Sequence, residues 1–255
     1  MIKKEKNGVV YYEFENIAAT GIVKHCFSTR IGGLSSFPYD EMNLAYHMGD
    51  DIETVAKNFQ IISDTVGFVA EDIILTNQIH EANYHVVTDK TKPHEVDSLI
   101  TNQAGYTLTS YYADCVPLLF VDPVKRVIAN AHAGWKGTVA QIGKKTVAAM
   151  QKEFGCAPLD IVVGVGPAIC QECFEVGDDV ARQFSDYPQH CKKKENEKWH
   201  IDLIGVNVDD LVEIGIRTSN IEVSQLCTFE EELFFSHRRL GSARGNMAAM
   251  IMLKE

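Results

Sequence analysis

The sequence predicts a mixed α/β layered fold. Strand-like segments are frequent and short, rich in β-branched or aromatic residues, and bounded by Gly, Pro, Asp or Asn. A smaller number of segments carries apolar residues at spacings of three and four, which indicates helices. The two kinds of segment alternate without a strict strand–helix–strand repeat, and no glycine-rich dinucleotide or phosphate loop is present. The pattern therefore favours layered sheets and helices over a barrel or a dinucleotide-binding fold.

The elements can be placed along the chain from these patterns. We predict strands at residues 22–29, 73–78, 85–88, 98–101, 117–121, 126–131, 161–165, 221–226 and 248–253. We predict helices at residues 51–66, 138–154, 176–184 and 206–216. The first two of these helices run up to Gly67 and Gly155, which are natural stop signals. Because no linker rich in Pro, Gly or Ser interrupts the chain and no repeat is found, we expect residues 1–255 to form a single domain.

Composition excludes some classes of protein. The formal net charge of -11 argues against nucleic-acid binding, which needs clustered Lys and Arg, although a locally basic pocket for a small anion is compatible with it. No segment approaches the roughly 20 apolar residues of a membrane span. The charged N-terminus lacks the apolar run of a secretion signal. Seven cysteines, an odd number, fit reduced thiols better than a disulfide framework. We expect a soluble, cytoplasmic protein without nucleic-acid or membrane partners, and the sequence names no protein partner.

Three short segments carry the chemistry: Gln78-Ile79-His80, Ala113-Asp114-Cys115 and His132-Ala133-Gly134-Trp135. Each lies at or just beyond a predicted strand. Two imidazoles and a thiolate could form a three-ligand zinc site with a fourth position open. The same groups could form a nucleophilic Cys with a His base. Their separations of 35 and 17 residues match no compact zinc motif, so the spacing leaves both interpretations open.

His132 is the most informative of the three residues. The small residues that follow it let the chain turn out of the strand at 126–131 and into the next predicted helix. A His at a strand end beside a helix N-terminus is well placed to face a ligand, and the free N–H groups there suit an anion.

Other polar residues have ordinary explanations as well as functional ones. Arg30 and the pair Arg238-Arg239 lie beside Gly-containing turns, and guanidinium groups suit phosphate. The Cys170-Gln171-Glu172-Cys173 segment has metal-binding spacing, but no second Cys or His pair in the sequence completes it, which favours free thiols. The mixed charges of residues 192–198 predict an exposed loop or turn.

Read together, these residues resemble one bacterial family. The motifs that carry the resemblance span nearly the whole chain, in order: Phe27-Ser28-Thr29-Arg30-Ile31-Gly32-Gly33, Asn43-Leu44, Gly49-Asp50-Asp51, Asn77-Gln78-Ile79-His80, Asp97-Ser98-Leu99-Ile100-Thr101, Ala113-Asp114-Cys115-Val116-Pro117, Ala131-His132-Ala133-Gly134-Trp135-Lys136-Gly137, Gly166-Pro167-Ala168-Ile169, Phe174-Glu175-Val176-Gly177 and Ser236-His237-Arg238-Arg239. The family is the YfiH type, long labelled polyphenol oxidase or laccase-domain proteins and now assigned purine nucleoside phosphorylase activity.

The resemblance implies both a fold and a function. The implied fold is a single catalytic domain, an α/β/β/α sandwich resembling the catalytic domain of cytotoxic necrotizing factor toxins. The implied cofactor is a metal, usually zinc, held by the catalytic residues His80, Cys115 and His132. The implied reactions are phosphorolysis of adenosine, inosine, guanosine and methylthioadenosine, and deamination of adenosine. We expect Arg30, Asn43 and Arg238 to bind substrate or phosphate. Arg244 is left out because Gly241-Ser242-Ala243 interrupts the family's usual Gly-Arg pattern.

Three rival functions remain open from the residues. A copper-dependent polyphenol oxidase fits the old family label, and copper could bind such a site in vitro; against it, multicopper sites use many histidines, typically in His-x-His pairs, and none of the nine His forms one. A hydrolase or amidase could use Cys115 as nucleophile and His132 as base. A module that binds metal or nucleoside without turnover is the third.

Overall fold

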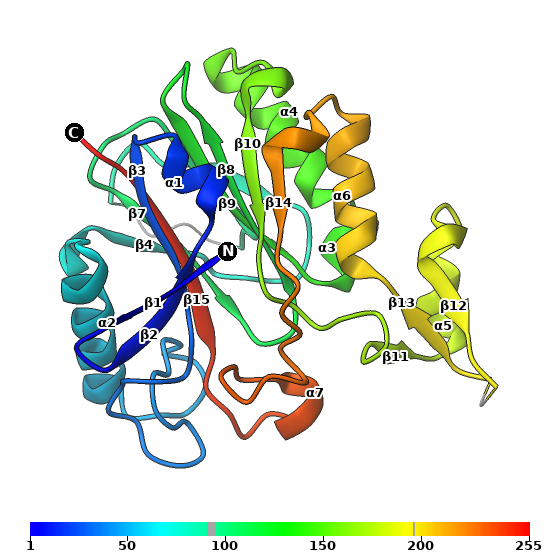
Figure 1. Cartoon of the computed structure of the whole chain (residues 1–255), viewed down its shortest axis with the longest axis horizontal. Coiled ribbons are helices and arrows are strands. Elements are labelled where there is room, and N and C mark those ends of the chain that lie inside the picture. The colour runs from blue at the N-terminus through cyan, green and yellow to red at the C-terminus, as the bar shows by residue number, and fades with distance from the viewer. Residues whose placement is uncertain (91–94, 196) are drawn as a thin grey trace.

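The computed structural model describes residues 1–90, 95–195 and 197–255. Two six-stranded mixed sheets pack against each other, and helices cover their outer faces (Figure 1). The mixed α/β fold with several sheets that the sequence predicts is confirmed. The order of layers from one side to the other is helix, sheet, sheet, helix.

The first sheet contains both ends of the described chain. Its strands, in spatial order, are β1 (Ile2–Lys6), β2 (Val9–Glu13), β3 (Val23–Ser28), β15 (Met247–Leu253), β7 (Thr107–Tyr112) and β4 (Ile73–Leu75). Neighbouring strands are antiparallel except β4 and β7, which are parallel.

The second sheet carries much of the middle of the chain. Its strands, in spatial order, are β14 (Ile221–Val223), β10 (Val162–Val165), β8 (Val116–Asp122), β9 (Val127–Ala133), β6 (Ser98–Thr101) and β5 (Tyr84–Val86). A small third sheet consists of β11 (Glu175–Val176), β13 (Trp199–Ile201) and β12 (Cys191–Lys193) and projects from one side of the molecule (Figure 1).

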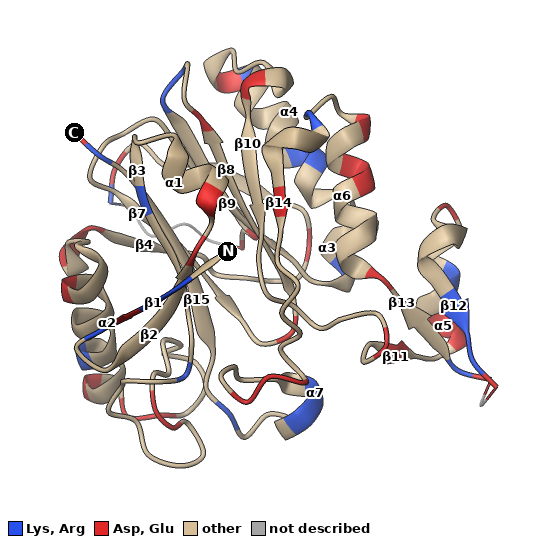
Figure 2. Ribbon diagram, in the orientation of Figure 1, with Lys and Arg blue, Asp and Glu red and all other residues tan. Residues whose placement is uncertain are grey.

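The helices are mostly short. They are α1 (Glu15–Ala19), α2 (Ile52–Val66), α3 (Trp135–Val139), α4 (Ile142–Phe154), α5 (Asp178–Ala181), α6 (Leu203–Glu213) and α7 (His237–Leu240). Helix α2 packs on the first sheet, whereas α4 and α6 pack on the second. Helices α2 and α6 carry Asp and Glu residues, whereas α4 carries Lys144, Lys145 and Lys152 beside Glu153, and α7 carries Arg238 and Arg239 (Figure 2).

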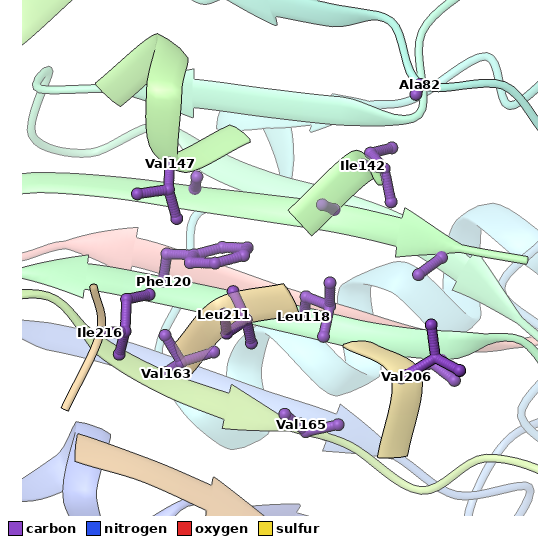
Figure 3. Close-up of a cluster of buried hydrophobic side chains, with 14 of the residues drawn as sticks. Ala82, Leu118, Phe120, Ile142, Val147, Val163, Val165, Val206, Leu211 and Ile216 are labelled. Carbon is purple, nitrogen blue, oxygen red and sulfur yellow. The ribbon is translucent and has the colours of Figure 1, made fainter. Parts of the chain in front are cut away.

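Side chains alternate between two cores along the central strands, as a strand periodicity of two requires. In β8, Leu118 and Phe120 pack against α4 and α6, where they meet Val147 and Leu211 (Figure 3). Leu119 and its alternating neighbours point instead into the core between the two sheets. Strand β15 is apolar along its whole length because helix α2 and the second sheet cover its two faces.

Some element boundaries differ from those predicted. The helix predicted at 138–154 is two helices, α3 and α4, because Gln141 adopts a left-handed conformation with φ of 58° between them. The segment predicted as a helix at 176–184 begins in strand β11 and continues as α5 followed by a 3-10 turn, Arg182–Phe184. The predicted exposed loop at 192–198 is in part strand, since β12 includes the first two lysines; residue 196 lies outside the described residues. Strands β1, β2, β7 and β13 are not predicted at all.

Among the described residues, no helix combines the length and the apolar character needed to cross a bilayer.

Candidate metal centre and cleft

Three elements from different parts of the fold supply the predicted ligands. His80 lies in the loop that follows β4, at the edge of the first sheet. Cys115 lies in the turn between β7 and β8, where the chain passes from the first sheet to the second. His132 lies on β9, directly opposite Pro117 of β8.

The fold brings these three side chains together. One ligand atom from each of His80, Cys115 and His132 lies within 4.8 Å of the others. The two imidazole rings meet edge to face, with centroids 4.8 Å apart and an interplanar angle of 90°. His132 is buried, Cys115 is half-buried and His80 is exposed, so the cluster reaches from the core to the surface. This is the geometry of a site that is fixed on one side and open to a ligand on the other.

A buried carboxylate, Asp97, organises two of the three residues. Its Oδ1 lies 2.8 Å from Nδ1 of His132 and accepts a hydrogen bond of 3.1 Å from the backbone N–H of His80. Its Oδ2 accepts from the backbone N–H groups of Ile79 and Glu81, at 3.2 and 3.0 Å. With Nδ1 engaged, Nε2 is the nitrogen that His132 presents to the cleft. A carboxylate behind a metal-binding His fixes the orientation of the ring and raises its basicity.

The backbone is unusual at His80 and at Asp114, the residue before the predicted ligand Cys115. His80 has φ of 59° and Asp114, just before Cys115, has φ of 89°. Non-glycine residues in the left-handed region persist where surrounding contacts hold them, and they cluster at functional sites. Asp97 supplies such contacts for His80. For Asp114, Thr228 Oγ1 and the backbone N–H of Arg238 both donate to its carboxylate, each at 2.7 Å.

Gly134 leaves the space in which the three side chains meet. A Cβ at this position would lie 3.0 Å from Cδ2 of His80, 3.2 Å from Sγ of Cys115 and 3.5 Å from Cε1 of His132. Its φ of -68° is open to any residue, so close packing and not backbone conformation favours glycine here.

The electrostatics of the cluster favour a thiolate. Burial raises the pKa of the Cys115 thiol, but the charges and hydrogen bonds of His132 and His80 outweigh it and lower that pKa to about 6. Burial lowers the pKa of His132, but the Cys115 charge and the Asp97 hydrogen bond raise it to about 9. Burial also raises the pKa of Asp97, yet its hydrogen bonds from His132 and the backbone bring it below the usual value. A thiolate and an Asp-oriented imidazole suit both a metal site and a nucleophile–base pair.

The cluster lies where two lobes of one cleft meet. The first lobe has a volume of about 420 Å³, and Tyr46, His47 and Tyr111 are among the residues lining it. The second lobe has a volume of about 400 Å³ and is lined by Ile169, Phe174 and Arg238 among others. The two lobes share four residues, which are His80, Ala113, Cys115 and Arg244. Cavities of this size suit small-molecule ligands.

Arginine side chains provide positive charge at this junction. Arg244 is half-buried and lines both lobes, and its buried Nε has no hydrogen-bond partner among the described residues. Burial lowers the pKa of the Arg244 guanidinium below its usual value, and the nearby charges of Asp114 and Cys115 offset part of this shift. Arg238 lines the second lobe, where its guanidinium lies 5.5 Å from the centre of the Phe174 ring. Arg239, in contrast, donates to the carbonyls of three neighbouring loop residues and lines neither lobe.

The structure does not bring Arg30 and Asn43 into the cleft. The Arg30 guanidinium forms an ion pair with Asp40 and also donates from Nε to its backbone carbonyl, at 2.8 Å. Asn43 is fully buried and its Oδ1 accepts from the backbone N–H of Asn246, at 3.0 Å. Neither residue is among those lining the two lobes. Arg30 holds the loop that contains Asp40, and Asn43 holds the segment that leads into β15 beside Arg244.

Comparisons with known proteins agree over almost the whole chain. A family model described as multi-copper polyphenol oxidoreductase laccase matches residues 24–254. The chain belongs to the YfiH-type, laccase-domain family. The purine nucleoside phosphorylase of Bacteroides thetaiotaomicron is 35% identical, over 99% of this chain and 98% of that protein. Adenosine deaminase RL5, from an unknown prokaryotic organism, is 33% identical over 81% and 85%.

A solved structure of the laccase-domain family shares the fold. The crystal structure of YlmD from Geobacillus stearothermophilus has a TM-score of 0.91 and 32% sequence identity, and the match covers 99% of this chain and 98% of that one. The relatives named for their reactions show that this chain is an enzyme.

The donor set of this laccase-domain chain fits a resident metal. One thiolate and two imidazoles suit zinc, and they bind copper as well. Asp97 behind His132 and the space left by Gly134 complete the observations in favour of a metal. The sequence analysis assigns no role to Asp97 and leaves out Arg244, and both belong to the site. Arg244 carries an available signal, because Gly245 follows it and an Arg beside a Gly-containing turn is the pattern that selects Arg30.

Proposed function

We propose that the chain is a zinc-dependent purine nucleoside phosphorylase that also deaminates adenosine. Its nucleoside substrates would be adenosine, inosine, guanosine and methylthioadenosine, converted with phosphate to the free base and the corresponding ribose 1-phosphate. The observation that carries this proposal is the convergence of His80, Cys115 and His132 at the junction of two lobes. Two lobes beside one reactive centre suit a reaction with two substrates.

The phosphate would bind in the second lobe. Arg238 and Arg244 line this lobe in a chain whose net charge is -11, so the positive charge there is local. Guanidinium groups bind phosphate oxygens through paired N–H donors. Arg244 lines both lobes, so its guanidinium would extend from the phosphate toward the reacting centre.

The nucleoside would bind in the first lobe. Tyr46, His47 and Tyr111 offer aromatic surface, and the ring of His47 meets that of Tyr111 edge to face at 5.6 Å. Flat apolar surface of this kind suits a purine base. A base held there extends to His80 and Cys115, which line the lobe at its inner end.

The ligand residues position the reacting groups. A zinc ion held by His80, Cys115 and His132 would act as a Lewis acid and provide a nucleophilic water near neutral pH. Asp97 keeps the His132 ring in place through the bond to Nδ1, and His80, as the exposed member, faces the bound nucleoside. In phosphorolysis an oxygen of phosphate forms a bond to the ribose carbon as the bond from that carbon to the purine nitrogen breaks. The positive guanidinium groups orient the phosphate for that attack.

The test is to incubate the purified protein with adenosine, with and without phosphate, and to separate the products. Adenine that forms only with phosphate demonstrates phosphorylase activity, and inosine without phosphate demonstrates deaminase activity. If neither product forms, the proposal is wrong. Oxidation of phenols by the copper-loaded protein, with no nucleoside turnover, would assign it instead to the oxidase named in the family description.

A Cys-dependent hydrolase is the second candidate, because the Asp97–His132 hydrogen bond and the low pKa of Cys115 fit a nucleophile–base pair as well as a metal site. Cys115, His132 and Asp97 have the order of a nucleophile, a base and an orienting carboxylate. His80 distinguishes the two candidates, because a metal centre needs it as a ligand and a nucleophile–base pair does not.

The substitution His80→Ala separates these two functions. The metal model expects loss of bound metal and of nucleoside turnover, with wild-type behaviour in a His85→Ala control, whose His lies on β5 away from the cleft residues. The hydrolase model expects His80→Ala to retain activity, reduced only by the loss of the His80 contribution to the low pKa of Cys115, and it expects activity that survives chelation and is lost on thiol alkylation.

We also propose that the protein works in the cytoplasm as a single catalytic domain over residues 1–255. The likeness to the catalytic domain of the necrotizing toxins stays a prediction.

A further inference from the structure

A second cluster of possible metal ligands consists of three thiols and lies beside the wall of the second lobe that Ile169 and Phe174 form. Cys170, Cys173 and Cys227 each have a sulfur within 4.8 Å of the other two. The first two lie in the loop after β10, and the third lies in the loop after β14, more than fifty residues further along the chain. Cys227 is buried and the other two are half-buried. The third cysteine that the Cys-x-x-Cys segment lacks in the sequence is therefore supplied by the fold.

The two loops are held beside each other by backbone contacts. Ala168 and Cys227 form a parallel bridge, and the backbone N–H of Thr228 donates to the carbonyl of Ala168 at 3.1 Å. Cys170 begins a tight turn, since its carbonyl accepts from the N–H groups of both Cys173 and Phe174, at 3.1 and 3.0 Å. The sulfurs thus converge on a backbone that other interactions already fix.

The distances fit a tetrahedral metal site. With Zn–S bonds of about 2.3 Å, two thiolates on one tetrahedral zinc lie about 3.8 Å apart. The three sulfurs here lie within 4.8 Å of one another, so movements of about 1 Å would bring them to that separation. An oxygen at about 2.1 Å from zinc lies about 3.6 Å from a coordinated sulfur. Oε1 of Glu230 lies 3.6 Å from Sγ of Cys173. Glu230 is exposed, so its carboxylate can turn toward the sulfurs without disturbing the core.

A backbone donor also points at one of the sulfurs. The N–H of Cys170 lies 3.3 Å from Sγ of Cys227. This contact holds the Cys227 sulfur against the turn that begins at Cys170, so the three sulfurs face one another across the two loops.

We propose that Cys170, Cys173 and Cys227 hold a second, structural metal ion of the zinc class, with Glu230 as the fourth ligand. Each thiol that binds the ion releases its proton to solvent. The site differs from the first in two ways. It has three thiolates, which select soft or borderline ions. The protein would also fill all four coordination positions, which is typical of structural zinc.

The second site would stabilise one wall of the catalytic cleft. Asp114, next to Cys115, accepts from Thr228 Oγ1 at 2.7 Å, and its carbonyl accepts from the N–H of Ile169 at 3.0 Å. Ile169 and Thr228 are the chain neighbours of Cys170 and Cys227. On the other side of the turn, the carbonyl of Cys173 accepts from Arg238, at 3.2 Å. Metal binding would therefore hold the two loops that position Asp114 and Arg238.

The experiment counts metal in the full-length protein after refolding or expression with zinc and removal of loosely bound ions. We expect two zinc ions per chain in the wild type. In Cys115→Ala, which removes a ligand of the first site, we expect one ion to remain. In Cys170→Ser/Cys173→Ser, we expect the loss of one ion, and in Cys191→Ser, a control for a half-buried thiol outside both clusters, we expect no loss.

Cobalt substitution gives a readout that does not depend on the number of zinc ions bound per chain. In the Cys115→Ala background, the second cluster is the group of three cysteines among the described residues that can give a thiolate-to-cobalt charge-transfer band. We expect this band, and we expect Cys173→Ser to weaken it. Because the two clusters share no ligand, the metal content of Cys115→Ala tests the second site whether or not the chain turns over nucleosides, and nucleoside turnover of the wild type tests the proposed function whether or not the second ion is bound.

Three results would overturn the proposal. One is a metal content that Cys170→Ser/Cys173→Ser does not change. Another is the absence of a cobalt–thiolate band in Cys115→Ala that is otherwise folded by circular dichroism. The third is a disulfide between Cys170 and Cys173 in freshly purified protein, detected as a mass lower by two hydrogens. Unchanged zinc affinity in Glu230→Gln would remove Glu230 from the ligand set.

Discussion

Asp97 is the residue on which two ligand positions depend. Replacing its carboxylate with the amide of Asn keeps the volume but removes the charge that stabilises the His132 ring and the backbone N–H groups around His80. Loss of such a partner typically costs 10–100-fold in metal affinity. We expect Asp97→Asn to weaken zinc binding by about tenfold or more, measured by competition with a chromophoric chelator. An affinity equal to that of the wild type would show that Asp97 does not orient the ligands.

Gly134 tests the packing of the same centre. The substitution Gly134→Ala places a methyl group 3.0 Å from the His80 ring and 3.2 Å from the Cys115 sulfur. Since the backbone there tolerates alanine, we expect the fold to persist while the ligands are pushed apart, with lower metal affinity and nucleoside turnover. Unfolding curves of the metal-free proteins serve as the control. A variant with full turnover would contradict this account of the glycine.

The residues of the site differ in how well the sequence predicts them. His80, Cys115 and His132 could be selected because imidazole and thiol are chemically distinctive and lie at strand ends. Asp97 could not, because an Asp before a strand looks the same whether it caps a turn or supports a ligand. Arg30 was selected for its charge, but the sequence does not show that Asp40 uses that charge.

At the scale of elements, helix α2 offers a simple test of local structure. Asp51 caps its N-terminus by accepting from the backbone N–H of Thr54 at 2.8 Å. Removing such a cap costs about 1 kcal/mol, whereas Asn preserves it. We expect Asp51→Ala to lower the free energy of unfolding by about that amount in urea titrations, and Asp51→Asn to remain near the wild type. Equal effects of the two substitutions would exclude the capping role.

The elements also show where sequence patterns stop being informative. Strand β15 could be predicted because both of its faces are buried, so that it is apolar throughout. Strand β1 could not, because it lies at the edge of its sheet, is mostly exposed and consists largely of Lys and Glu. The break between α3 and α4 depends on the left-handed Gln141, and helical periodicity continues through it without a signal.

For the molecule as a whole, a buried histidine links stability to pH. His25 on β3 is 3% exposed, and its Nε2 accepts from the backbone N–H of Phe14 at 2.8 Å, which requires the neutral ring. Burial lowers the pKa of His25 from 6.5 to about 4. Between these values the unfolded chain binds a proton that the folded chain does not. The contribution of the neutral His25 ring to the free energy of unfolding is therefore fully present above pH 6.5. It decreases by roughly 3 kcal/mol as the pH falls toward 4.

The variant His25→Gln isolates this contribution, because the amide oxygen can accept the same hydrogen bond but does not titrate. We expect the wild type to lose more stability than the variant between pH 6.5 and 4, in urea unfolding followed by circular dichroism at matched ionic strength. Parallel pH profiles of the two proteins would show that His25 does not account for acid sensitivity.

The turn through Cys115 has a consequence for how the enzyme matures. The chain passes there from the first sheet to the second, His80 lies in the loop between β4 of the first sheet and β5 of the second, and His132 lies on β9 of the second sheet. A nascent chain with only one sheet formed holds an incomplete donor set. The metal would thus bind only the assembled fold and stabilise it against unfolding by mass action. Metal loading of the first centre would then be the last event of maturation, and a partly folded chain would lack the complete donor set.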